Sequence, residues 1–183
     1  MIRSSGKREL VFFIILYTVF YLFTASVVPY IGVKPAIPGA DVLAFSTVRP
    51  DIMLALVICT GILANGKRKV VLGIIFGFIV DVTCSVPMLS SLTYCLCGLY
   101  ASKLSRIVFG RGVVNTVFAA VPLLLIRAAV SIFYLLGTWH NIGFFEILAG
   151  AVIPEYLCNL VAVAVVYLIT VALMRLFRIE KSV

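Results

Sequence analysis

The chain has 183 residues, of which 63% are hydrophobic and 12% are charged, and its mean hydropathy is +1.22. A soluble domain of this size needs a polar surface that this composition does not supply, so a water-soluble globule is excluded. Fifteen Lys and Arg against seven Asp and Glu give a formal net charge of +8. Membrane orientation accounts for these basic residues, so no nucleic-acid partner is expected.

Six apolar segments follow one another along the chain, and each is expected to be a helix because a backbone in lipid must satisfy its own hydrogen bonds. They run from Leu10 to Ile31, Val42 to Ala64, Val70 to Leu89, Ser91 to Ser105, Val113 to Thr138 and Ile147 to Leu173. No repeat or long linker divides the chain. The predicted fold class is all-α: a polytopic helical membrane protein with about six transmembrane helices in one bundle, forming one domain over residues 1–183.

Basic residues fall in alternate gaps between these segments. Twelve of the fifteen lie before the first segment or after the second, fourth and sixth, namely Arg3, Lys7, Arg8, Lys67, Arg68, Lys69, Lys103, Arg106, Arg111, Arg175, Arg178 and Lys181. The opposite gaps hold only Lys34 and Arg49. The positive-inside rule therefore predicts a multi-pass protein with both termini in the cytoplasm. The first segment has no cleavage site after it and is expected to remain as a helix.

The second segment is interrupted at its start by Pro50. Proline forces the residue before it out of helical geometry, so the helix proper is expected to begin at Asp51. From Asp51 to Ala64 it spans only about 21 Å, which is short of a membrane core of about 30 Å. The second crossing is therefore either a short helix in a thinned region or one completed by the irregular segment before it, and longer neighbours could bury it. Pro50 and Asp51 suit the first turn of a helix, where a missing donor is harmless and an acid meets the positive end of the helix dipole.

The third segment carries Gly73, Gly77 and Asp81 at intervals of four residues. This spacing places them on one face, along which another helix can approach closely. We interpret it first as a packing face.

Three charged residues lie deep inside apolar segments. Asp81 and Arg127 are about 17 Å and 21 Å from the cytoplasmic side, and Glu155 is about 12 Å from the other side. Each charge costs about 2.5 to 3.5 kcal/mol at a helix centre unless it is paired. Arg127 is therefore expected to meet Asp81, Glu155 or both. The cluster could fix helix register, bind a partner or polar ligand, or transfer protons.

The last segment contains Pro154, Glu155 and Asn159. Pro154 is expected to kink or start the helix, and Glu155 and Asn159 face the same way one turn apart.

The five cysteines show no metal-ligand spacing and are interpreted as packing residues. No catalytic motif, cofactor site or metal site is found, so an enzyme is not expected.

Taken together, the Arg49-Pro50-Asp51 start, the basic turn at 66–69, the row of Gly73, Gly77 and Asp81, and the 154–159 element resemble the MreD family of rod-shape-determining membrane proteins. The resemblance covers nearly the whole chain. It implies a non-catalytic scaffold of the cell-wall elongation complex in the bacterial cytoplasmic membrane. The implied partners are an MreC-like protein and, through it, MreB filaments, the RodA glycosyltransferase and a class B penicillin-binding transpeptidase.

The fold is also similar to that of the substrate-binding subunits of energy-coupling-factor vitamin transporters, which is the alternative function. Those subunits carry an Ala-x-x-x-Ala pair on their first helix, whereas this chain has Tyr17, Tyr21 and Ala25 there. Such a subunit also needs an outward polar and aromatic pocket. Trp139, His140 and Asn141 could contribute to one, although an interfacial anchor and solvated loop residues explain them more simply.

Overall fold

The computed structural model describes residues 5–26, 50–63, 67–84, 89–104, 112–138, 143–177 and 179, and its elements are all helices within these ranges. They are α1 (Ser5–Ser26), α2 (Ile52–Leu63), α3 (Lys67–Cys84), α4 (Leu89–Leu104), α5 (Val113–Thr138), α6 (Phe144–Ile147), the π-helical turn η3 (Leu148–Val152) and α7 (Ile153–Leu176). The all-α prediction is confirmed for this part of the chain.

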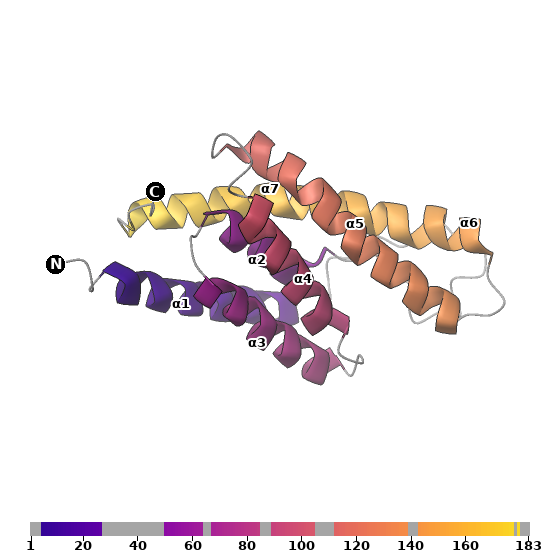
Figure 1. Cartoon of the computed structure of the whole chain (residues 1–183), viewed down its shortest axis with the longest axis horizontal. Helices are drawn as coiled ribbons and strands as arrows, with labels where there is room; N and C mark the ends of the chain where they lie inside the picture. Colours follow the sequence, from indigo (N-terminus) through magenta and orange to yellow (C-terminus); the bar gives the residue numbers. More distant parts are fainter. Residues whose placement is uncertain are drawn as a thin grey trace.

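The short helix α2 lies at the centre of the bundle, as Figure 1 shows. It packs against α1, α3, α4, α5 and α7, and its residues from Met53 to Leu63 are all buried. Its sequence is apolar on every side, which is typical of a helix surrounded by other helices. The prediction of a short second helix buried by longer neighbours is therefore confirmed. It begins at Ile52, one residue after the expected start, and residues 42–49 lie outside the described ranges.

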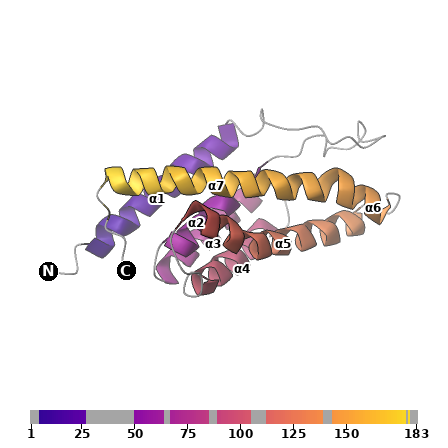
Figure 2. The same ribbon diagram turned by 90° about the horizontal axis from the view of Figure 1, so that it is seen from above.

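Helices α1, α3, α4, α5 and α7 are arranged around α2. Helix α3 packs along α4, α4 also touches α5, and α5 packs along α7. Helix α1 packs on α2 and α3 but makes no close backbone approach to α7. The start of α1 and the end of α7 lie at the same end of the bundle (Figure 1), and α1 crosses α7 obliquely when seen from above (Figure 2).

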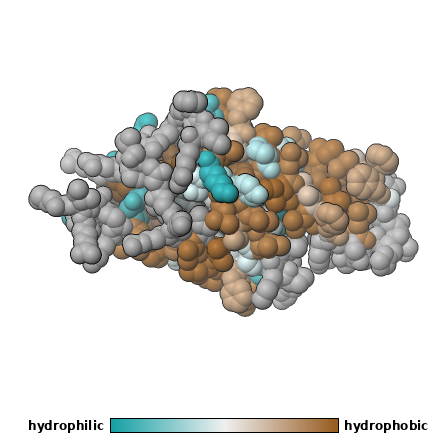
Figure 3. Space-filling model, viewed as in Figure 1, coloured by the Kyte–Doolittle hydropathy of each residue, from teal (hydrophilic) through white to brown (hydrophobic). Residues whose placement is uncertain are grey.

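Among the described residues, three helical stretches are long and apolar enough to cross a membrane: Arg8–Ser26, Val113–Phe133 and Leu148–Leu176. Ile52–Leu63 and Val71–Thr83 are shorter apolar helices. The surface of the described residues is mostly hydrophobic in Figure 3, and Phe118 and Phe133 of α5 are 72% and 79% exposed. Such a surface suits contact with lipid.

The last long helix contains a local change of winding. The π-turn η3 joins α6 to α7, and Pro154 lies in the first turn of α7. Proline has no N–H to donate, and its place in the first turn suits a helix start, where that donor would have no partner within the helix. The prediction that Pro154 kinks or starts the helix is confirmed, since α7 starts at Ile153 after the π-turn.

Candidate functional site

Asp51 joins three helices near the centre of the bundle. Its carboxylate Oδ1 accepts hydrogen bonds from the backbone N–H of Leu54 at 2.9 Å and from the Tyr94 hydroxyl of α4 at 2.7 Å. Its own backbone N–H donates to Oδ1 of Asn159 in α7 at 2.7 Å. Asp51 is therefore the N-cap of α2, which confirms the capping role. Pro50, half-buried, comes directly before it.

Arg127 of α5 pairs with Glu155 of α7. The Arg127 Nε lies 3.3 Å from Glu155 Oε1, and the Ser131 hydroxyl, one turn further along α5, lies 3.5 Å from Glu155 Oε2. Asp51 also lies within electrostatic range of Arg127. The side chains of Arg127 and Glu155 are 20% and 23% exposed, so the pair reaches the edge of the bundle. The prediction that Arg127 pairs inside the bundle is confirmed, with Glu155 as its partner.

Asn159 completes this group from one turn below Glu155. Its side chain is 1% exposed, and its Oδ1 accepts the hydrogen bond from Asp51. Its Nδ2 has no hydrogen-bond partner among the described residues. We call the whole group the central polar cluster, which consists of Asp51, Tyr94, Arg127, Ser131, Glu155 and Asn159.

Asp81 is not part of the central polar cluster, so the possible pairing of Asp81 with Arg127 is not found. Its two carboxylate oxygens accept hydrogen bonds from the backbone N–H groups of Ser90 and Ser91 at 2.9 Å and 2.8 Å, and the Ser91 hydroxyl also donates to it. These N–H groups lie in the first turn of α4, where the helix has no acceptor of its own. Asp81 therefore caps α4 from the end of α3, and its charge is stabilised by the positive end of that helix.

The glycines of α3 are packed inside the bundle, as the packing-face prediction requires. A Cβ at Gly77 would lie 2.9 Å from the Ser91 Cα and 2.9 Å from the Tyr94 ring, both in α4. A Cβ at Gly73 would lie 3.1 Å and 3.2 Å from the two Val57 methyl groups in α2. Because this face is covered by the chain's own helices, it is not open to a partner.

No group of three or more His, Cys, Asp and Glu side chains that could hold a metal ion occurs among the described residues. Cys59, Cys95, Cys97 and Cys158 are free thiols, and the first and third of these are buried in the core. Trp139, His140 and Asn141 of the possible outer pocket lie outside the described residues.

Two members of the central polar cluster were not predicted from the sequence. Ser131 follows Arg127 by four residues and so shares its face of α5, which is a signal that the sequence contains. Tyr94 lies in an apolar segment, where a buried hydroxyl needs a partner. Neither signal identifies the partner helix.

Comparison with known proteins finds no family model, no curated protein and no solved structure that matches this chain.

Proposed function

We propose that the protein is a non-catalytic integral membrane scaffold of the bacterial cell-wall elongation complex, and that it maintains cell shape by binding an MreC-like partner. In this proposal the chain crosses the cytoplasmic membrane about six times, with both termini in the cytoplasm. It acts on MreB filaments, the RodA glycosyltransferase and a class B penicillin-binding transpeptidase only through that partner.

One observation supports this proposal most strongly: each charge of the described interior ties two helices together. The Asp51 carboxylate connects α2 to α4, Arg127 and Glu155 connect α5 to α7, and the Asp81 carboxylate connects α3 to α4. The backbone N–H of Asp51 adds a link from α2 to α7. Charges used in this way fix the relative positions of helices. A bundle held like this is suited to present a constant outer surface to other proteins.

The outer surface offers several apolar faces to a partner helix. Phe78 of α3, Leu125 and Phe133 of α5 and Val161 of α7 are each at least half exposed. Helices associate in lipid through packing of such side chains and not through a hydrophobic driving force, so shape decides which face is used.

Photo-crosslinking in living cells tests the proposal. A photoreactive residue is placed at each of these exposed positions, and at Ala120, which is fully buried, as the matched control. We expect crosslinks to a co-expressed MreC-like protein from one of the exposed faces and none from Ala120. If no exposed position crosslinks to it and the two proteins do not copurify, the scaffold proposal is wrong.

A second candidate is the substrate-binding subunit of an energy-coupling-factor vitamin transporter. Two features favour it: the buried Nδ2 of Asn159 has no partner, and among described residues the only hydrogen bond of Arg127 uses Nε. The remaining donors of these side chains could bind a polar ligand. Equilibrium binding of a vitamin panel to the purified protein tests this candidate. Saturable binding that Asn159→Leu abolishes would favour it over the scaffold.

A further inference from the structure

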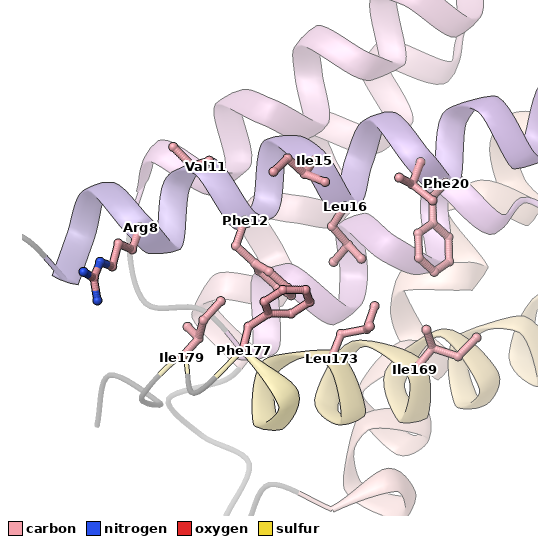
Figure 4. Close-up of a pocket in the computed structure, with 11 residues that line it drawn as sticks. Arg8, Val11, Phe12, Ile15, Leu16, Phe20, Ile169, Leu173, Phe177 and Ile179 are labelled. Atoms are coloured by element: carbon pink, nitrogen blue, oxygen red, sulfur yellow. The ribbon is translucent and has the colours of Figure 1, made fainter.

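An apolar groove runs between α1 and the C-terminal part of α7. Its volume is about 720 Å³. Figure 4 shows Phe12, Leu16 and Phe20 directed from α1 toward α7, and Leu173 and Phe177 directed back toward α1. The rings of Phe12 and Phe177 meet with their centroids 5.8 Å apart, so the two walls are held together there.

The side chains along the groove are left uncovered by the described part of the chain. Val11, Ile15 and Val19 of α1 are 54%, 57% and 55% exposed, and Ile169 of α7 is 41% exposed. All four line the groove. In a membrane, an apolar surface of this kind is in contact with lipid acyl chains or with an apolar segment of a protein.

The length of the groove identifies the kind of occupant. On α1 the lining runs from Arg8 to Phe20, which is about 18 Å along the helix axis. The hydrocarbon core of a bilayer is about 30 Å thick, and a crossing helix needs about twenty residues to span it. The groove therefore matches the depth of one leaflet and is too short to accommodate a whole crossing helix.

A positive charge at one end of the groove indicates that the occupant has a negatively charged headgroup. Arg8 is the only charged residue among the eleven that line it. It is exposed and has no ion-pair partner within the described residues. Arg175, in the last turn of α7, is exposed at the same end of the bundle. Basic side chains at the membrane surface attract anionic lipid headgroups.

We propose that this groove binds one anionic phospholipid, from the leaflet at the basic end of the bundle. Its phosphate lies at Arg8, and an acyl chain lies over Phe12 and Phe177 and extends along Leu16 and Ile169. The site is independent of the central polar cluster and of the scaffold function.

Native mass spectrometry of the purified protein tests this proposal. The delipidated protein is incubated with equal amounts of phosphatidylglycerol and phosphatidylcholine that carry the same acyl chains. We expect one phosphatidylglycerol to be retained in preference. Arg8→Gln is expected to weaken its binding about fivefold, whereas Lys103→Gln, at an exposed cation on α4, leaves it unchanged.

A second pair of variants tests the apolar part of the site. Ile169→Trp fills the groove and is expected to lower retention of both lipids. Leu168→Trp is the matched control, because Leu168 is 55% exposed and does not line the groove. Circular dichroism verifies that all four variants keep their helix content.

Three results would overturn the proposal. In the first, the wild-type protein retains the two lipids equally, and Arg8→Gln does not change the amount retained. Another is retention that Ile169→Trp leaves intact, which would indicate lipid bound elsewhere. The third is loss of a dimer or of partner copurification on Ile169→Trp with lipid binding unchanged, which would assign the groove to a protein.

Discussion

The two sides of the bundle are held by different forces. On one side α2, α4, α5 and α7 meet at the central polar cluster. There the Asp51 carboxylate links α2 to α4, the Arg127–Glu155 pair links α5 to α7, and the Asp51 backbone N–H links α2 to Asn159 of α7. On the other side α1 rests on α2 and α3 by apolar packing, with one hydrogen bond at 2.8 Å between the Tyr17 and Thr60 hydroxyls.

This difference shows what buried charge does in such a bundle. Apolar packing gives little directional information in lipid, because acyl chains are as apolar as the helices. A charge must find its partner, so it selects one arrangement of the helices that carry the two groups. The helices around the central polar cluster are thereby fixed, whereas α1 leaves a groove open beside α7.

The largest expected effect on stability comes from Arg127→Met. This change leaves two carboxylates, Asp51 and Glu155, without their nearby positive charge. We expect a loss of about 3 kcal/mol in the free energy of unfolding, measured by titration with a denaturing detergent from mixed micelles. Glu155→Gln is expected to cost less, because Arg127 still lies near Asp51. Equal stabilities of wild type and Arg127→Met would contradict the claim that charged contacts hold this side of the bundle together.

Gly77→Ala is expected to cost about 2 kcal/mol, because the new methyl group meets the Ser91 backbone and the Tyr94 ring. Gly73→Ala should cost less, since its closest contacts are the movable methyl groups of Val57. Gly112→Ala is the control, because nothing lies within 4 Å of its Cβ. The same detergent titration ranks the three variants, and a different order would show that the α3 to α4 contact is not as close as described.

Asp81→Ala is expected to cost about 1 to 2 kcal/mol, because the N–H groups of Ser90 and Ser91 lose their acceptors. Hydrogen exchange measured by mass spectrometry should show faster exchange at the start of α4. Val82→Ala, at a position 64% exposed, should leave both quantities unchanged. Unaltered exchange in Asp81→Ala would contradict the capping role.

The smallest predicted quantity is a difference between two variants, one on each side of the bundle. Tyr94→Phe removes a hydrogen bond to the carboxylate of Asp51, and Tyr17→Phe removes one to the neutral hydroxyl of Thr60. Bonds to charged groups contribute about 1.5 to 3 kcal/mol and neutral ones about 0.5 to 1.5 kcal/mol. Tyr94→Phe should therefore be the more destabilising of the pair in the same titration. The reverse order would mean that the α1 side is held as firmly as the central polar cluster.

Much of the helical organisation could be predicted from the sequence. The predicted fifth segment, Val113 to Thr138, coincides with α5, and the predicted short helix after Pro50 corresponds to α2. Long apolar runs that end at basic residues or proline predict both the helices and their approximate ends, because a backbone in lipid must form helices. Pairing of Arg127 followed from the cost of an isolated charge, since only a few acids lie at a similar depth.

The choice between Asp81 and Glu155 could not be made from the sequence. It depends on which helices are neighbours, and α3 is separated from α5 by α4. The π-turn before Pro154 could not be predicted from the sequence either, because a proline at a helix start does not determine how the turn before it is wound. The groove beside α1 depends on the angle at which two helices cross, and apolar periodicity does not determine that angle.

The most direct test of this account is a double-mutant cycle between Arg127 and Glu155, with Arg127→Met, Glu155→Met and the double variant unfolded under the same conditions. We predict a coupling energy of about 1 to 3 kcal/mol between the two side chains. The double variant is then expected to lose less stability than the two single variants lose together. Additive losses, within about 0.5 kcal/mol, would contradict the claim that this pair ties α5 to α7.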